Sequence, residues 1–174
     1  MKKTFSFGVI IAGAIIALAI IGFFAGARVN TSKSIRLGLY WVSSAPVKKG
    51  AYVIFCPPQR EIFDIAMERG YIKAGFCPGG YGYMIKRVLA AKNDVVTIAD
   101  DGVRVNGEQL PFSAPMKTDK AGRPLSRYEF NSYTLDSSEV LLMTDVSATS
   151  FDGRYFGPIS RSQIKTVVRP IITW

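Results

Sequence analysis

Serine and lysine are the side chains on which nucleophilic chemistry in this chain depends, because its 174 residues include no histidine. Without histidine there is no Ser-His-Asp or Cys-His pair, no histidine-ligated zinc and no imidazole general base. The two cysteines are too few for a tetrathiolate zinc or iron–sulfur site. A general base near neutral pH is then a carboxylate, a tyrosine, a lysine or water, and lysine is the known substitute beside a serine nucleophile. We expect no metal and no cofactor.

Lys86 is the lysine best placed to be such a base. It lies in the run YMIKRVL at residues 83–89, where strand alternation puts Met84, Lys86 and Val88 on one face. A lysine acts as a base only when neutral, and burial among apolar neighbours lowers its pKa from about 10.4 toward 7. Periodicity alone leaves a competing interpretation, an edge-strand lysine that points into water.

The N-terminal segment is the first element that positions these residues. Residues 4–27 carry no charge. The apolar stretch 7–27, at about 1.5 Å per residue, matches the roughly 30 Å hydrocarbon layer of a bilayer. Lys2 and Lys3 precede it, which favours a cytoplasmic N-terminus and export of everything from residue 28 onward.

A cleaved signal peptide is the alternative for this segment. Ala25-Gly26-Ala27 resembles a small-residue cleavage site. The apolar run is longer than a usual signal-peptide core, so we favour an uncleaved anchor. The predicted organisation is a short cytoplasmic N-terminus at 1–6, a transmembrane signal-anchor helix at 7–27 and an exported domain at 28–174.

Export changes what the cysteines predict. Cys56 and Cys77, each followed by proline, would meet an oxidising compartment, where a disulfide closing the loop between them adds roughly 3 kcal/mol in the chain-entropy model. Two free thiols are the alternative. A catalytic cysteine is disfavoured because no histidine is available to lower its pKa.

The exported part has mainly β patterns. Asp101-Gly102 and Asn106-Gly107 are dipeptides typical of hairpin turns. One helix is predicted at 61–70 and an exposed loop at 111–126. We therefore expect a mostly β domain, without repeats or a second domain. Its predicted strands are short runs of β-branched and aromatic residues, at 39–42, 51–55, 83–89, 95–99, 103–105, 139–144 and 166–168.

The formal charge of +9 does not predict nucleic-acid binding. The arginines are scattered along the chain, and no basic run with interleaved aromatics occurs. A basic surface near anionic lipid is the better interpretation.

Four sequence blocks occur in the order found in the type I signal peptidases, a superfamily of Ser/Lys serine peptidases. Within it, the chain resembles most the TraF-type conjugative-transfer peptidases, because of its short length, single anchor and CPP and CPGG pair. The resemblance implies a signal-peptidase-like β domain on a single N-terminal transmembrane helix. The blocks are SIRLGLY at 34–40, KGAYVIF at 49–55, MIKRV at 84–88 and SFDGRYFG at 150–157, with a similar hairpin at 102–107.

The resemblance also implies roles for individual residues. Ser34 falls on the nucleophile and Lys86 on the general base. The family forms its oxyanion hole from the backbone N–H of the nucleophile and a hydroxyl two residues earlier, which implies Ser34 and Ser32.

The last block contributes supporting residues. Asp152 falls on an aspartate linked to activity in this branch, and we expect it to order the loop near the lysine. A structural ion pair of Asp152 with Arg154 or Arg87 is the competing interpretation. Ser150 and Arg154 match the same block. One departure is Arg36, which stands where the family usually has proline and puts substrate preference in doubt more than chemistry.

The function that the resemblance implies is cleavage of a membrane-bound precursor, the conjugative pilin, by a membrane-anchored serine endopeptidase. Some relatives close the pilin into a ring with its own amine. The implied location is the bacterial inner membrane, single-pass, with the catalytic domain in the periplasm. The implied partners are the pilin precursor, the bilayer and components of conjugation or type IV secretion.

Two other functions stay open from the sequence. One is a general signal peptidase I that removes signal peptides from many exported precursors. The other is a non-catalytic, membrane-anchored assembly protein of a secretion channel, which would need neither Ser34 nor Lys86.

Overall fold

The computed structural model describes residues 2–174, with side chains from residue 8 onward. Most elements are β-strands, so the predicted mostly β fold is confirmed. Two short 3-10 turns, η1 (Pro78–Gly80) and η2 (Arg161–Gln163), complete the chain. The helices are α1 (Lys2–Ala25), α2 (Glu61–Glu68) and α3 (Gly153–Phe156), and the strands are β1 (Ala27–Asn30), β2 (Gly38–Ser43), β3 (Tyr52–Phe55), β4 (Met84–Ala90), β5 (Val95–Ala99), β6 (Gly102–Val105), β7 (Glu108–Gln109), β8 (Phe130–Thr134), β9 (Glu139–Met143), β10 (Ile159–Ser160) and β11 (Ile164–Thr173).

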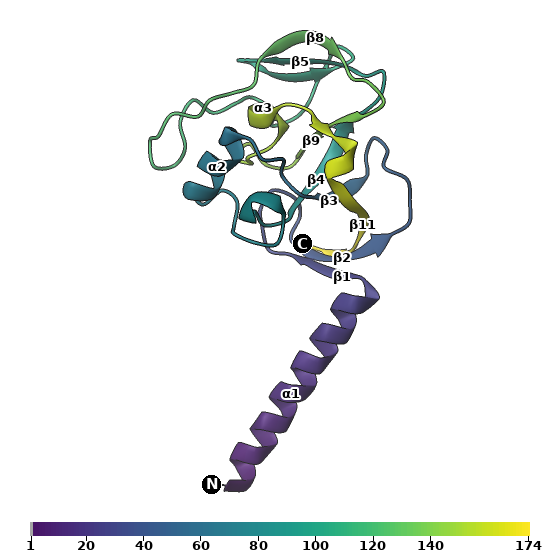
Figure 1. Ribbon diagram of the computed structural model, residues 1–174, viewed down its shortest axis with the longest axis vertical. Helices are drawn as coiled ribbons and strands as arrows, with labels where there is room; N and C mark the ends of the chain where they lie inside the picture. The colour runs from purple at the N-terminus through teal and green to yellow at the C-terminus, as the bar shows by residue number, and fades with distance from the viewer. Residues whose placement is uncertain (1) are drawn as a thin grey trace.

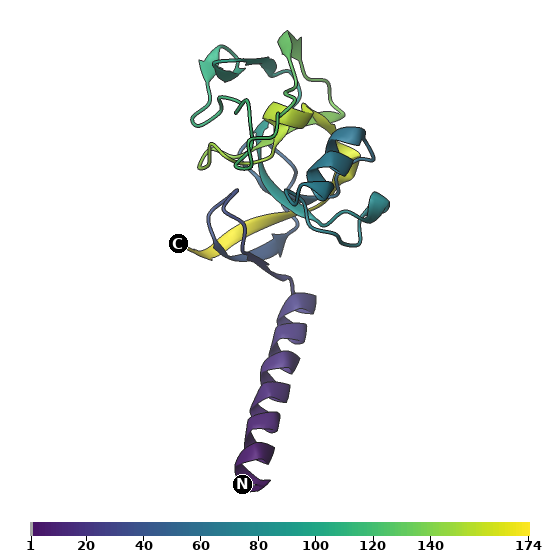
Figure 2. The same ribbon diagram turned by 90° about the vertical axis from the view of Figure 1, so that its left-hand side faces the viewer.

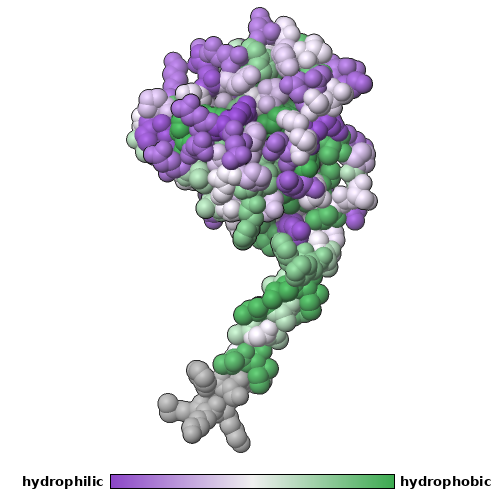
Figure 3. Space-filling view, in the orientation of Figure 1, coloured by the Kyte–Doolittle hydropathy of each residue, from purple (hydrophilic) through white to green (hydrophobic). Residues whose placement is uncertain are grey.

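Helix α1 projects from the β domain as a separate rod (Figures 1 and 2). Its stretch Gly8–Ala25 is long and apolar enough to cross a bilayer, and none of it is buried against the rest of the chain. Figure 3 shows a hydrophobic rod below a largely hydrophilic domain surface. The helix ends two residues before the predicted boundary, because Gly26 takes a φ of 112° and Ala27 begins β1.

A seven-stranded sheet forms the larger part of the domain, in the order β1-β2-β11-β3-β4-β9-β10. Strand β4 is an interior strand, paired antiparallel with β3 on one side and β9 on the other. Lys86 faces Val53 across the β3–β4 pair. The edge-strand interpretation of Lys86 is therefore wrong.

A smaller four-stranded sheet has the order β7-β6-β5-β8. The two predicted hairpin turns join β5 to β6 and β6 to β7. At the second turn, Asn106 and Gly107 both have positive φ, 55° and 84°, as a two-residue hairpin loop requires. The predicted loop at 111–126 lies outside the helices and strands, whereas β8 was not predicted, because Phe130–Thr134 is mostly exposed and lacks apolar alternation.

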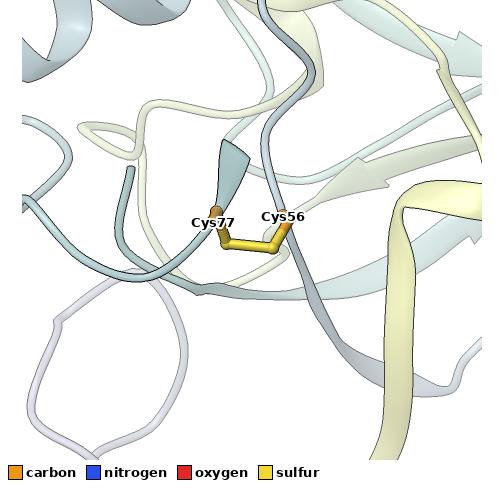
Figure 4. The surroundings of a disulfide bond; sticks show 2 residues. All are labelled: Cys56 and Cys77. Atoms are coloured by element: carbon orange, nitrogen blue, oxygen red, sulfur yellow. A yellow bond between two sulfur atoms is a disulfide. The ribbon is translucent and has the colours of Figure 1, made fainter. Parts of the chain in front are cut away.

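Helix α2 packs its buried residues, Phe63 and Ala66, against the core of the larger sheet. The rings of Phe63 and Phe156 lie 5.0 Å apart. The predicted disulfide joins Cys56 to Cys77 within this core, with Cα atoms 5.4 Å apart (Figure 4). The alternative of two free thiols is wrong.

Candidate active site

Ser34 lies half-buried in the turn that joins β1 to β2. The buried side chain of Asn30 holds this turn. Its Nδ2 donates to the carbonyl oxygens of Ser32 (2.8 Å), Ile35 (3.2 Å) and Arg36 (3.0 Å), and its Oδ1 accepts from the Ser32 N–H (3.1 Å). A buried amide with its hydrogen bonds satisfied in this way fixes the backbone around Ser34. Sequence reasoning missed Asn30, since a single asparagine at a strand end has no distinguishing pattern.

Lys86 points from β4 into the protein and is 2% exposed. Its Nζ donates to Ser150 Oγ at 2.7 Å, and Ser150 Oγ donates to Ser34 Oγ at 3.2 Å. The fold thus brings together three predicted residues that are far apart in the sequence. The Ser150 hydroxyl lies between the other two, and no direct Ser34–Lys86 hydrogen bond is found in residues 2–174.

The surroundings of Lys86 favour its neutral form. Burial lowers the pKa of Lys86 from 10.5 to about 8, with the negative charge of Asp152 opposing this change and the positive charge of Arg154 adding to it. At pH 7 about a tenth of the molecules then have a neutral amine, against fewer than about one in a thousand for an ordinary lysine. This is the perturbation that a lysine base requires.

Asp152 and Arg154 form a fully buried ion pair beside the site, each 0% exposed. Arg154 donates through Nε to Oδ1 (2.8 Å) and through Nη2 to Oδ2 (3.0 Å) of Asp152. The ion-pair interpretation of Asp152 is confirmed with Arg154 as partner, whereas Arg87 pairs with Asp145 instead. Both carboxylate oxygens are occupied, and Asp152 also accepts from the Arg154 N–H as the N-cap of α3, so it orders the turn that carries Ser150.

The glycine of the last block permits this turn to lie against β9. A Cβ atom on Gly153 would sit 2.7 Å from Leu141 Cδ1 and 3.0 Å from the Leu142 carbonyl oxygen. Only a residue without a side chain approaches the strand this closely. The buried ion pair and Gly153 together fix the position of Ser150.

Comparison with known proteins identifies the family to which this chain belongs. A model of the signal peptidase family, peptidase S26, matches residues 1–174. The chain belongs to the signal peptidase S26 family. Two Escherichia coli relatives, each named plasmid transfer protein TraF, are 75% identical over 173 residues (99% of this chain, 97% of the relative) and 67% identical over 162 residues (93% of this chain, 92% of the relative).

More distant relatives of this family member have similar names. Conjugal transfer protein TraF of Agrobacterium fabrum strain C58 is 35% identical over 169 residues, 96% of this chain and 92% of the relative. Among solved structures, a signal peptidase I from Enterococcus faecalis V583 has a TM-score of 0.42 and 16% identity, covering 73% of this chain and all of its own.

Ser32, the predicted second donor of the oxyanion hole, is exposed, and its Oγ donates to Asn30 Oδ1 at 2.9 Å. A hydroxyl has one hydrogen to donate, so Ser32 would have to turn away from Asn30 to reach a substrate oxygen. Its role stays a prediction.

Arg36, at the position where the family usually has proline, is exposed. Its carbonyl oxygen accepts from Tyr40 Oη (2.8 Å) and from Asn30 Nδ2 (3.0 Å). These two hydrogen bonds hold the backbone that a proline ring would otherwise restrict.

Among the described residues, no group of three or more Cys, Asp and Glu side chains is placed to hold a metal ion.

Proposed function

We propose that this family member is a membrane-anchored serine endopeptidase in which Ser34 is the nucleophile and Lys86 the general base. The observation that carries the proposal is the hydrogen-bond chain from buried Lys86 through Ser150 to Ser34. A lysine whose pKa is lowered to about 8 by burial is matched to base catalysis near neutral pH. Membership of the S26 family supports the same assignment.

The arrangement supports a two-step acyl transfer. When Lys86 is neutral, its Nζ accepts a hydrogen bond from Ser150, which in turn accepts from Ser34, the reverse of the direction found with a charged Lys86. Ser34 Oγ then attacks the scissile carbonyl carbon, as its proton passes to Ser150 Oγ and the Ser150 proton passes to Lys86 Nζ. The Ser34 N–H, joined by the Ser32 hydroxyl once it leaves Asn30, donates to the oxyanion, a type of contact that contributes about 3 kcal/mol. The Lys86 ammonium then protonates the leaving amine as the acyl-enzyme forms. Neutral Lys86 finally removes a proton from the acceptor, which is water or an amine of the substrate, and the proton returns to Ser34 Oγ as the bond from Ser34 to the acyl carbon breaks.

The substrate we propose is anchored in the same membrane as the enzyme. Only β1 and a short turn separate Ser34 from the end of α1, so a membrane-spanning α1 keeps the site near the bilayer surface. Lys2 and Lys3 before the apolar stretch and the disulfide support an inner-membrane anchor with a periplasmic domain. The names of the relatives, plasmid transfer and conjugal transfer proteins, support a pilin precursor of conjugation as the substrate, processed beside the other components of the transfer apparatus.

Reconstitution of the chain in vesicles with the pilin precursor of the same transfer system tests this function. We expect the wild-type chain to trim the precursor, Ser34→Ala to leave it intact, and Ser44→Ala, a matched change at an exposed serine, to behave as wild type. Mass spectrometry identifies the acceptor, since a product one water lighter than the trimmed peptide has been closed into a ring.

Two outcomes would contradict the proposal. Cleavage of unrelated signal-bearing precursors in preference to the pilin would indicate a general signal peptidase. Normal pilus assembly with Ser34→Ala would indicate a non-catalytic assembly protein.

A further inference from the structure

A pocket lies next to the turn that carries Ser150. It has a volume of about 320 Å³ and is enclosed by the end of α2, the loop at 111–126 and residues 149–155. Its lining combines aromatic and cationic side chains, chiefly Arg69, Tyr71, Lys120, Arg123, Phe151 and Tyr155.

The loop side of this pocket is held by Asp119. Its carboxylate accepts hydrogen bonds from the Tyr71 hydroxyl, from Arg123 Nε (2.7 Å) and from the Arg123 N–H (2.9 Å). The Tyr71 hydroxyl and then Arg123 hold the pKa of Asp119 well below its usual range. Arg69 Nη1 donates to the Pro124 carbonyl oxygen (2.7 Å) and ties the loop to the end of α2.

The opposite wall is aromatic. The rings of Phe151 and Tyr155 are stacked, with centroids 5.8 Å apart and an angle of 9° between their planes. The ring centroid of Tyr71 lies 5.7 Å from that of Phe151. The Tyr155 hydroxyl accepts from the Met116 N–H at 3.0 Å, which joins this wall to the loop. Both sides of the pocket are therefore fixed before any ligand arrives.

The pocket has an excess of positive charge. Arg123 neutralises Asp119, the one acidic residue in the lining. Arg69 and Lys120 take part in none of the ion pairs within residues 2–174. Two cations beside an aromatic wall suit a carboxylate that adjoins an apolar side chain.

The pocket is close to the candidate active site along the chain. Thr149 and Phe151 line it, and they flank Ser150, which contacts Ser34 and Lys86. The pocket and the candidate active site therefore share one turn of the backbone, residues 149–151, and a substrate that runs along this turn would meet both.

We propose that this pocket binds a carboxylate-bearing residue of the substrate near the scissile bond, with the adjoining apolar side chain against Phe151 and Tyr155. Arg69 and Lys120 would then be specificity-determining residues that select an acidic segment. The identification of the ligand as substrate rests on the proposed peptidase function, whereas the charge preference of the pocket does not.

Binding of short peptides to the full chain carrying Ser34→Ala, in detergent micelles, tests the pocket without any turnover. The probes are acetyl-leucyl-glutamate amide, acetyl-leucyl-alanine with a free carboxyl end, and neutral acetyl-leucyl-glutamine amide. We expect at least one acid to bind about tenfold or more tightly than the neutral probe, as hydrogen bonds to a charged group allow. The tighter of the two acids identifies a side-chain or a terminal carboxylate as the source.

The preference for acid should depend on the two unpaired cations. Arg69→Gln with Lys120→Gln should abolish it. Arg69→Lys with Lys120→Arg should keep it, because charge rather than side-chain identity is preserved. The control, Lys92→Gln with Arg169→Gln, removes the same charge from exposed positions outside the pocket lining and should bind as the parent does. Equal binding of all three probes, or equal loss in the control, would overturn the inference.

Turnover separates the two proposals. For the wild-type chain, replacing acidic residues near the scissile bond of the cleaved precursor by glutamine should raise KM about tenfold with little change in kcat. Cleavage without any acid preference would overturn the pocket and leave the peptidase proposal intact. Acid binding by a chain whose cleavage does not need Ser34 would leave the pocket and overturn the peptidase proposal.

Discussion

The two sheets of this domain treat polar side chains differently. The seven-stranded sheet and its connecting turns bury Asn30, Lys86, Ser150, Asp152 and Arg154. Among the described residues, the four-stranded sheet buries no charged side chain, and its core consists of aliphatic residues from β5, β6 and their neighbours. Its ion pairs, such as those of Arg104 with Asp101 and Arg127 with Asp100, lie at the surface.

This difference indicates which buried side chains contribute mainly to stability and which have another role. Burying a charge is unfavourable unless it is paired, and a buried ion pair is often no more stabilising than apolar residues of the same shape. Lys86 is buried and takes part in none of the ion pairs within residues 2–174, so its burial adds no stability through pairing, whereas a lysine whose pKa is lowered in this way is typical of a functional site. The smaller sheet has the composition expected of a purely structural element.

The largest expected effect follows from changing one residue in each region. Ser34→Ala should lower the rate of precursor cleavage at least about a thousandfold, with the free energy of unfolding within about 0.5 kcal/mol of wild type. Val103→Ala, at a fully buried position of β6, should lower the free energy of unfolding by about 2 kcal/mol and leave the rate of the folded protein unchanged. A large loss of stability in Ser34→Ala, or a large loss of cleavage rate in folded Val103→Ala, would contradict this division between the two sheets.

The pH dependence of the rate is the second test. Because Lys86 must be neutral and burial lowers its pKa to about 8, the cleavage rate should rise with pH through about 8 and then level off. Lys86→Arg should be inactive at every pH, since a guanidinium does not deprotonate in this range. Lys92→Arg, at an exposed lysine, is the matched control. A flat wild-type profile from pH 6 to 10 would remove lysine from the mechanism.

The same pKa shift of Lys86 also predicts how stability changes with pH. Between about pH 8 and 10.5, the unfolded chain binds the lysine proton and the native chain does not, so the free energy of unfolding rises with pH. The rise attributable to Lys86 is on the order of 3 kcal/mol. Comparison with Lys86→Met in chemical denaturation isolates it. If the free energy of unfolding changed with pH in the same way in both proteins, the pKa of Lys86 would not be lowered in the native state, and this prediction would be wrong.

The sequence predicted the parts of the fold that local patterns specify. Alternation along β4 placed Lys86 on the same face as Met84 and Val88, and the structure shows that this face is buried, which the pattern alone left open. What it missed depends on tertiary pairing: the short β1, the full length of β11 between β2 and β3, and the exposed edge strand β8. Short or mostly exposed strands such as β1 and β8 have little apolar pattern, and β11 extends beyond the predicted run at 166–168 because it pairs with both β2 and β3.

The residues of the candidate site were predicted to a similar degree, and their catalytic roles stay a prediction. The resemblance of sequence blocks supplied Ser34, Lys86, Ser150 and Asp152. It did not supply the position of Ser150 between Lys86 and Ser34, because hydrogen-bond order within a cluster depends on side-chain geometry. It also missed Asn30, whose importance arises only from the carbonyl groups that the β1–β2 turn directs toward it.

Reduction of the disulfide is a test confined to stability. Cys56 and Cys77 lie in the core beneath α2, so breaking the bridge should lower the free energy of unfolding by roughly 3 kcal/mol through the entropy of the unfolded chain. The cleavage rate per folded molecule should stay the same. Denaturation with and without reductant, with Cys56→Ala and Cys77→Ala together as the control, measures this. A loss of activity under conditions where the protein stays folded would connect the bridge to the chemistry.

The smallest expected effects come from two buried serines, one in each region. Ser150 accepts from Lys86 and donates to Ser34, whereas Ser113 accepts from the Val103 N–H (3.0 Å) and donates to the Leu110 carbonyl oxygen (2.6 Å). Ser150→Ala should lower kcat about tenfold, as the loss of about 1.4 kcal/mol from a proton-transfer path implies. Ser113→Ala should instead lower the free energy of unfolding by about 1 kcal/mol and leave kcat unchanged.

The pair of serine variants is informative because the substitution is identical and both hydroxyl groups are buried. A purely structural Ser150 would lower the free energy of unfolding when replaced, as Ser113 does, and its loss would leave kcat unchanged. A Ser150 that relays the proton should slow the reaction without shifting the pH profile toward that of an ordinary lysine, because the burial of Lys86 is the main cause of its lowered pKa. If Ser150→Ala and Ser113→Ala changed the free energy of unfolding and kcat by the same amounts, Ser150 would have no role beyond that of an ordinary buried serine. The proposed functional difference between the two sheets would then not extend to Ser150.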